Sequence, residues 1–306
     1  MGLIDKALGN SLKFIPKPII RKVAAKYIAG EQVKNAVEET RRLNKCGCLT
    51  TIDFLGESIK TKEEADASVK TYLEVLDSIH HHKLDANISV KPTHFGLSLD
   101  PALFEANMNR VANRAKELGI FVRIDMEDSS TTDQTLTAFK RLRSNGVSNI
   151  GIVLQAMLRR TFDDLRSLED VAPSIRICKG IYREPEQVAF QKYEEVNASY
   201  LRLLEHALPN PKYRIAIATH DDPIVAGAEK LITRIGLKKT DYEFQMLLGV
   251  RSEIREGLLQ RGHRVRVYVP FGASWYAYCV RRLQENPKFA MFITKDVLKD
   301  PSILFK

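Results

Sequence analysis

The chain has 306 residues, of which 44% are hydrophobic and 28% charged, and its formal net charge is +9 at pH 7. This length suits one large α/β domain or two ordinary domains, and no stretch approaches the roughly 18 consecutive apolar residues of a membrane-spanning helix. The first residues lack the layout of a secretory signal. We therefore expect a cytoplasmic protein whose cysteines are all reduced: Cys46, Cys48, Cys178 and Cys279.

Residues 1–45 are predicted to form a basic helical arm in front of the main domain, residues 46–306. Seven lysines and arginines between Lys6 and Lys34 are interleaved with Leu, Ile, Phe and Val. This pattern is typical of a helix that contacts anionic lipid at the inner face of the cytoplasmic membrane. It is equally typical of a helix that packs on the main domain with its lysines in water. The charge is not gathered in a nucleic-acid-binding motif, so no nucleic acid partner is expected.

Eight hydrophobic runs of strand length follow, separated by segments with helical periodicity. The predicted strands are residues 48–55, 87–91, 121–125, 149–155, 174–179, 214–220, 242–247 and 265–269. Predicted helices include residues 61–80, 101–117, 133–144 and 185–208. Such alternation requires crossover connections and hence a parallel sheet, and eight units over about 260 residues match a closed (βα)8 barrel. A doubly wound open sheet is the alternative, and the absence of a GxGxxG after any strand counts against it.

The first of these helices ends in three consecutive histidines, His80, His81 and His82. We interpret them as an exposed run on the surface and predict no metal site.

Polar residues gather at the carboxyl ends of the predicted strands, which is where barrels of this type carry their active sites. The nine are Asp53, Lys91, Asp125, Glu127, Gln155, Lys179, Thr219, His220 and Gln245. Lys91 and Asp125 end neighbouring strands, so we expect an ion pair that lowers the pKa of the aspartate and keeps both groups charged. A lysine at a strand end also suits a Schiff-base lyase, so a reaction through Lys91 or Lys179 stays open.

The segment after the last strand is predicted to be a helix with one polar face. Tyr278, Arg281, Arg282 and Glu285 are spaced i, i+3, i+4 and i+7, which places them on the same face. An outer barrel helix would present apolar residues there. Paired arginines suit bidentate capture of a carboxylate or phosphate, although a solvated stripe of charge is the alternative.

Seven segments resemble, in order, the motifs of the proline dehydrogenase family. They are residues 89–93, 123–127, 153–156, 176–182, 218–221, 243–247 and 278–285. The resemblance is to the short monofunctional bacterial members. It implies an α/β protein, a distorted (βα)8 barrel whose last helix lies over the barrel mouth. It also implies oxidation of L-proline to 1-pyrroline-5-carboxylate, the first step of proline catabolism, by hydride transfer from C5 to N5 of a non-covalent FAD, with electrons passed to a membrane quinone.

The resemblance also implies a role for each matching residue. The residues nearest the chemistry would be Asp125, beside the substrate amine and orienting Lys91, and Arg176, stabilising negative charge on the reduced flavin. The substrate carboxylate would be clamped by Arg281 and Arg282 with Lys91, braced by Glu285, while Tyr278 covers the ring. The apolar slot would be lined by Tyr182, Leu247 and Tyr268, and the flavin would be held by Met126, Gln155, Arg176, Lys179, Gly180, Ile181, Thr219 and His220.

One position departs from the family pattern: Ile181 stands where alanine is usual before Tyr182. Facing the pocket, Ile181 would narrow it; turned away, it would be harmless. Enzymes that oxidise 4-hydroxyproline tend to carry a smaller residue at the position of Tyr268, so this tyrosine favours proline. The alternatives that stay open are a 4-hydroxyproline dehydrogenase, a Schiff-base lyase on the same barrel and a catalytically silent barrel that binds a carboxylate.

Overall fold

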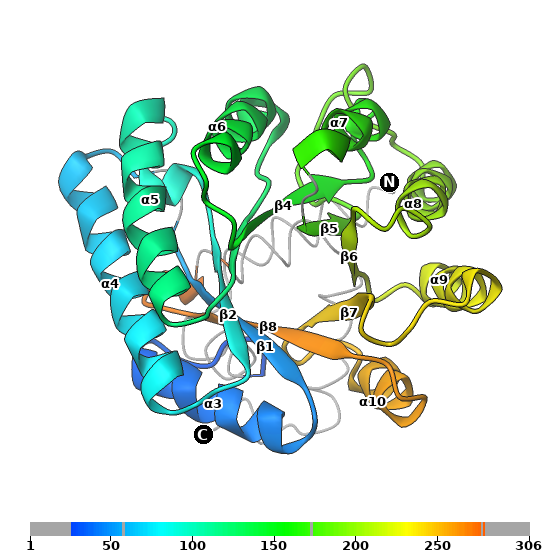
Figure 1. Cartoon of the computed structure of the whole chain (residues 1–306), viewed down its shortest axis with the longest axis horizontal. Coiled ribbons are helices and arrows are strands. Elements are labelled where there is room, and N and C mark those ends of the chain that lie inside the picture. The colour runs from blue at the N-terminus through cyan, green and yellow to red at the C-terminus, as the bar shows by residue number, and fades with distance from the viewer. Residues whose placement is uncertain (1–25, 57–58, 172–173, 277, 279–306) are drawn as a thin grey trace, which may run out of the picture.

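Eight parallel strands form a closed barrel in chain order, with β8 paired to β1 (Figure 1). The computed structural model describes residues 26–56, 59–171, 174–276 and 278. The strands are β1 (Leu49–Phe54), β2 (Ala86–Val90), β3 (Val122–Ile124), β4 (Ile150–Gln155), β5 (Ser174–Cys178), β6 (Arg214–Ala218), β7 (Tyr242–Leu247) and β8 (Val265–Phe271). Each lies where the sequence predicts a strand, so the (βα)8 architecture is confirmed and the open sheet is excluded.

Helices surround the sheet on its outer side (Figure 1). Within the described residues they are α3 (Val33–Lys45), α4 (Lys62–His81), α5 (Pro101–Glu117), α6 (Thr132–Ser144), α7 (Thr161–Ser167), α8 (Tyr193–Ala207), α9 (Asp222–Ile235) and α10 (Ser252–Gln260). None of the helices in this part of the chain combines the length and the hydropathy of a membrane span.

Local capping explains where two of the long helices begin. The Thr61 hydroxyl accepts the backbone N–H of Glu64 at the start of α4, and the Glu64 carboxylate accepts the backbone N–H of Thr61 in return. Asp100 caps α5, whose first residue is Pro101. Both are established ways of satisfying the free N–H groups of a first turn.

The helix predicted over residues 185–208 is too long at its start, because α8 begins at Tyr193. The backbone of residues 188–190 pairs with the segment after β4 instead. Arg159 donates its N–H to the Val188 carbonyl, and Phe190 donates to the Met157 carbonyl. These hydrogen bonds use the groups that a helix would need.

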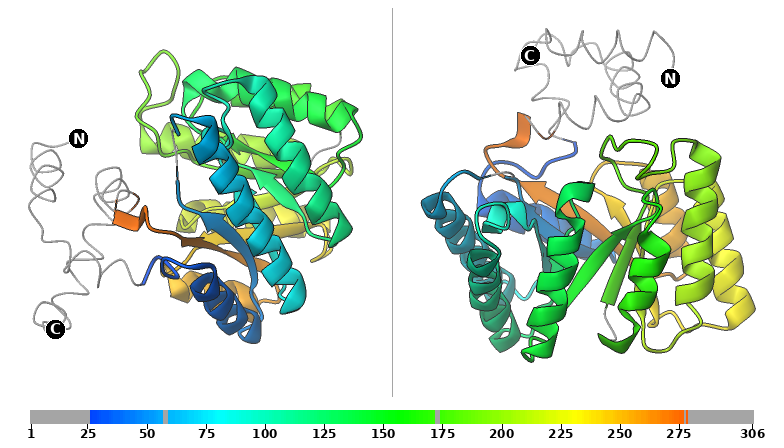
Figure 2. Two further views of the ribbon diagram at one scale, coloured as in Figure 1. Left: turned by 90° about the vertical axis from the view of Figure 1, so that its left-hand side faces the viewer. Right: turned by 90° about the horizontal axis from the view of Figure 1, so that it is seen from above.

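Helix α3 covers the seam between β8 and β1, as Figure 2 shows from a second direction. Leu43 packs there with Cys48, Val267 and Val269, and the preceding segment is tied to the end of β8 by the N–H of Ala29. In a regular barrel the helix that follows β8 would cover this seam. The place is therefore filled from the N-terminal side of the chain. The predicted course of the last helix over the barrel mouth lies outside the described residues.

The two faces of the barrel wall differ in chemistry. Outward side chains such as Ile52, Ile88 and Ile177 are buried against the helices. Hydrogen bonds between strands that are not neighbours show that polar side chains fill the interior: β5 contacts β3 through Arg176 and Asp125, and it contacts β7 through Arg176 and Gln245. Most barrels of this type are filled by branched apolar residues. This barrel differs because its interior side chains form polar contacts with one another.

Candidate active site at the barrel mouth

A buried ion pair holds Lys91 at the mouth, and its partner is Asp53. The Lys91 Nζ donates to both Asp53 carboxylate oxygens, at 2.9 and 2.8 Å. Asp53 is fully buried, and burial raises its pKa to about 6 although Lys91 acts to lower it. The predicted pair between Lys91 and Asp125 is therefore wrong. Lys91 has a carboxylate on each side, and Asp125 is already engaged by other donors.

Asp125 accepts three hydrogen bonds from three different strands. One Asp125 oxygen accepts from Arg176 Nη1 at 2.7 Å and from the Ser89 hydroxyl at 2.6 Å, and the other accepts from the Tyr268 hydroxyl at 3.0 Å. Burial, together with the carboxylates nearby, holds the pKa of Tyr268 well above its usual value. The phenol therefore stays a neutral donor, and the three hydrogen bonds fix Asp125 in position.

Gln155 Oε1 and Arg176 Nη2 are buried polar atoms at this end of the barrel that have no hydrogen-bond partner, and His94 Nδ1 beside Phe54 is another. Gln155 uses its amide nitrogen on the carbonyls of Met126 and Glu127, at 3.1 Å each, which leaves the oxygen as a free acceptor. Arg176 Nη2 is a free donor. Burying such atoms unpaired is costly, so both are suited to a ligand that offers a donor and an acceptor. The polar edge of a flavin ring offers both.

Gly180 follows Lys179 and lets the chain bend after β5. Its φ of +96° lies in the left-handed region, and a Cβ atom at this position would come within 2.5 Å of the Met157 sulfur. Only glycine therefore fits this bend of the chain, which directly follows the polar end of β5.

Lys179 and His220 complete this side of the mouth. The Lys179 Nζ donates to Asp221 at 2.7 Å and lies 4.3 Å from the centre of the Tyr193 ring. His220 Nε2 accepts the backbone N–H of Leu247 at 2.8 Å. Burial, together with Arg251, lowers the pKa of His220 to about 4. The imidazole is therefore neutral, with its proton on Nδ1, and it can donate one hydrogen bond to a ligand.

The residues predicted to line the apolar slot come from three separate segments. Tyr268 lies within the mouth, where the Arg176 guanidinium sits 5.4 Å from the centre of its ring, and Leu247 ends β7. Tyr182 packs against a small apolar cluster formed by Met157, Leu158 and Ala189. Ile181 is 37% exposed, so it is not enclosed in a tight slot.

The last helix is described only at its beginning. Tyr278 is 6% exposed, and its electrostatic contact with Tyr268 places it near the mouth. Arg281, Arg282 and Glu285 lie outside the described residues, so their roles stay predictions.

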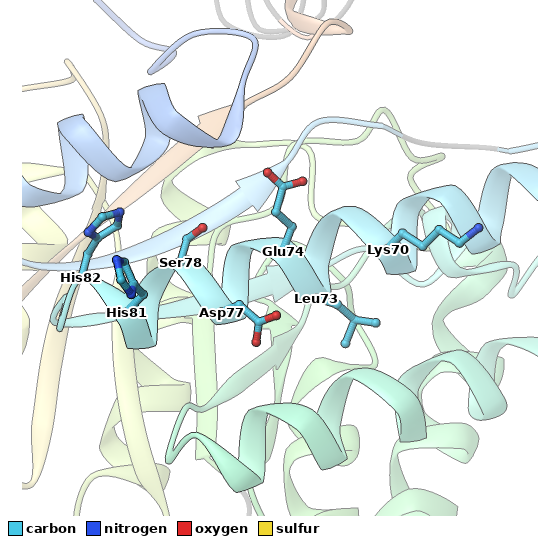
Figure 3. Close-up of a pocket in the computed structure, with 7 residues that line it drawn as sticks. All are labelled: Lys70, Leu73, Glu74, Asp77, Ser78, His81 and His82. Atoms are coloured by element: carbon cyan, nitrogen blue, oxygen red, sulfur yellow. The ribbon is translucent and has the colours of Figure 1, made fainter.

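The histidine run and the hollow beside it lie away from this site. The hollow follows the outer surface of α4 (Figure 3). It is lined by Lys70, Leu73, Glu74, Asp77, Ser78, His81 and His82. Among the described residues no group of three or more His, Cys, Asp or Glu side chains is arranged to hold a metal ion.

Sequence reasoning gave no role to several residues that build the site. The sequence predicts Asp53 and Gln245 only as polar strand-end residues, and Ser89 and Glu243 only as parts of motifs. The alternation of side chains along a strand could have predicted that two of these residues face the interior, because residues two positions apart lie on the same side. Glu243 must face the interior because Gln245 does, and Ser89 must because Lys91 does.

Comparisons with known proteins agree on one family. The model of the family described as "Proline dehydrogenase" matches residues 36–295. Proline dehydrogenase 1 of Bacillus subtilis is 35% identical over 276 residues, which cover 90% of this chain and 91% of that protein. The proline dehydrogenase of Deinococcus radiodurans is 34% identical over 281 residues, 90% of each.

A solved structure gives the same result for the fold. Proline utilization A (PutA) from Bdellovibrio bacteriovorus, inactivated by N-propargylglycine, matches with a TM-score of 0.80 and 27% identity. The match covers 86% of this chain and 32% of that one, so the chain spans about a third of the longer protein.

Proposed function

The chain belongs to the proline dehydrogenase family. We propose that its barrel mouth binds FAD non-covalently beside L-proline, and that the bound proline is oxidised there to 1-pyrroline-5-carboxylate. The chain is an oxidoreductase that acts on proline, as its family membership shows. The observation that supports the cofactor is the pair of unpartnered buried atoms, Gln155 Oε1 and Arg176 Nη2.

On the cofactor side, we propose that these two atoms bind the polar edge of the flavin ring. Arg176 Nη2 would then stabilise negative charge as it develops on that ring. The remaining contacts to the cofactor are proposed for Met126, Lys179, Gly180, Ile181, Thr219 and His220. The proton on His220 Nδ1 supports one of these assignments.

On the substrate side, we propose that Arg281 and Arg282 bind the proline carboxylate with Lys91, braced by Glu285 and covered by Tyr278. Lys91 is held in place by Asp53, so its position does not depend on the substrate. Asp125, fixed by its three donors, would lie beside the amine. Tyr182, Leu247 and Tyr268 would line the slot for the ring. The flavin, when bound, supplies the hydride acceptor for proline C5, and the protein supplies placement and charge complementarity.

The Schiff-base alternative is disfavoured by the lysines themselves. A lysine attacks a carbonyl only as a neutral amine. Lys91 donates to two oxygens of one buried carboxylate, and Lys179 is paired with Asp221. Both amines are therefore engaged by a carboxylate and are not placed to attack a carbonyl.

We further propose that electrons leave for a membrane quinone and that the protein is cytoplasmic, with peripheral contact to the membrane. Residues 1–45 would form the arm and residues 46–306 the barrel. Within the arm, α3 packs on the barrel, so the lipid contact is proposed for the basic residues that precede it. Co-sedimentation with liposomes that persists after residues 1–32 are deleted would contradict this role of the arm.

Purified protein tests the main proposal directly. We expect a yellow preparation whose flavin absorbance is bleached by L-proline without air, and less readily by 4-hydroxyproline compared side by side. A faster response to 4-hydroxyproline would assign the chain to the other substrate. Colourless protein that borohydride traps with a carbonyl compound would contradict the flavin proposal in favour of the lyase.

A further inference from the structure

Arg176 is held on two sides, and only one of these contacts is an ion pair. Its Nη1 donates to Asp125 at 2.7 Å and to the Ser89 hydroxyl at 3.3 Å, whereas its Nε donates to Gln245 Oε1 at 2.5 Å. A guanidinium is planar and rigid, so two contacts at different nitrogens fix both its position and its plane. The remaining nitrogen, Nη2, is the buried free donor of the site.

The contact at Nε depends on which way the Gln245 amide is turned. The oxygen and nitrogen of an amide occupy similar space, so shape alone does not choose between the two orientations. Here Gln245 Nε2 donates to Glu243 Oε1 at 2.5 Å. An ionised carboxylate accepts only, so it requires the amide nitrogen on its own side. The amide oxygen is thereby turned toward Arg176.

Glu243 is itself kept ionised inside the barrel. Arg266 donates to its two oxygens, at 2.7 and 3.0 Å. Burial acts to raise the pKa of Glu243, but the contacts with Arg266, together with Gln245 and Arg123, hold that pKa below its usual value. The interior thus contains a continuous chain of hydrogen bonds that runs from Arg266 through Glu243 and Gln245 to Arg176.

We propose that Gln245 is a positioning residue that sets the direction of Arg176 Nη2, and that Glu243 fixes the orientation of the Gln245 amide. The inference rests on the proposed flavin site, since Arg176 Nη2 is assigned to the cofactor there. Gln245 is not assigned a contact with substrate or cofactor. It is 6% exposed and has both ends of its amide engaged.

Replacing Gln245 with methionine tests the inference, because methionine fills similar space and accepts no hydrogen bond of this strength. In Gln245→Met we expect kcat to fall about tenfold, the effect of losing one hydrogen bond to a charged group. The KM for proline should change less, because Arg176 is not assigned to the substrate carboxylate. The flavin midpoint potential should become more negative, and a tenfold weaker preference for reduced flavin corresponds to about 30 mV in a two-electron couple.

Gln245→Glu provides a second and sharper signature. The new carboxyl group lies beside Glu243, and two adjacent carboxylates cannot both ionise easily, so the pKa of one is raised. Below that pKa, a protonated carboxyl at position 245 can donate to Glu243 and still accept from Arg176, as glutamine does. We therefore expect kcat close to that of the wild type at low pH and a loss of kcat as the pH rises. The matched control is Gln260→Met at the exposed end of α10, which should leave kcat and potential unchanged.

The outcomes separate the two proposals. Wild-type protein that binds no flavin would overturn the proposed function. Wild-type protein that binds flavin, together with a Gln245→Met enzyme of unchanged kcat and potential, would overturn only the positioning role. A Gln245→Glu enzyme whose kcat follows the wild-type pH profile would overturn it as well, including where Gln245→Met fails to fold.

Discussion

Asp125→Asn would show how much of the barrel's stability depends on a single buried charge. The Arg176 and Asp125 side chains are 8% and 13% exposed. An asparagine can keep all the hydrogen bonds of the site: its oxygen accepts from Arg176 and Ser89, and the Tyr268 hydroxyl can turn to accept from its nitrogen. Mainly the negative charge is lost, which leaves the Arg176 charge uncompensated. Removing one partner of a buried ion pair costs about 3–5 kcal/mol, and the retained hydrogen bonds place this variant near the lower value.

Urea unfolding of the holoenzyme at pH 7 measures this cost. We expect the free energy of unfolding to fall by about 3 kcal/mol with an unchanged m-value. The matched control is Asp222→Asn, whose carboxylate pairs with Arg251 at the surface and is 65% exposed. That change should cost less than about 1 kcal/mol. An Asp125→Asn protein as stable as this control would refute the reasoning, because it would mean that Arg176 is stabilised without its carboxylate.

Three further predictions concern the ligand contacts. Gly180→Ala should lower the ratio of bound flavin to protein, measured by absorbance, because the left-handed φ costs about 1–3 kcal/mol and the new Cβ meets Met157; full flavin occupancy would contradict this. The pKa of His220 is lowered in the fold to about 4. The contribution of this histidine to stability is therefore present above its usual pKa of about 6.5 and is lost as the pH falls through about 4. Urea titrations at several pH values between these limits should show a smaller loss of stability in His220→Gln than in the wild type. Arg281→Met or Arg282→Met should raise the KM for proline by about two orders of magnitude and leave bound FAD intact, whereas loss of flavin with an unchanged KM would reverse the assigned roles.

The order of the elements could be predicted from the sequence because each strand is a separate apolar run. Ile150–Gln155, for example, is apolar up to a single polar end residue, and both features follow from a strand that is covered on its outer face and open at the mouth. The start of α8 could not be predicted in the same way. Residues 185–192 have a composition that a helix tolerates, but their backbone is engaged by the segment after β4, a contact between distant parts of the chain.

The contents of the mouth could be predicted more easily than its pairings. The carboxyl ends of the strands lie together in a parallel barrel, so the sequence predicts Lys91, Asp125 and Gln155 at the same mouth. Their partners depend on which side chains are already engaged. Lys91 has Asp53 on one side and Asp125 on the other, and the choice follows from Arg176, which reaches Asp125 across the barrel from β5. The order of strands in the sequence predicts which strands are adjacent, whereas side-chain pairs that cross the barrel can be identified only in the closed structure.

The same contacts across the barrel explain why so polar an interior is compatible with a stable fold. Three interior ion pairs join different strands: Lys91 with Asp53, Arg176 with Asp125 and Arg266 with Glu243. The buried Arg123 donates instead to the backbone carbonyls of Ile152 and Ser174. These three pairs join β2 to β1, β5 to β3, and β8 to β7, so they connect the barrel wall while they orient the mouth. A substitution in one of them should therefore alter stability and cofactor contacts together, whereas the free atoms Gln155 Oε1 and Arg176 Nη2 can be used by a ligand without breaking any pair. That separation between paired charges and free donors and acceptors allows one set of residues to hold the barrel closed and still present a binding surface.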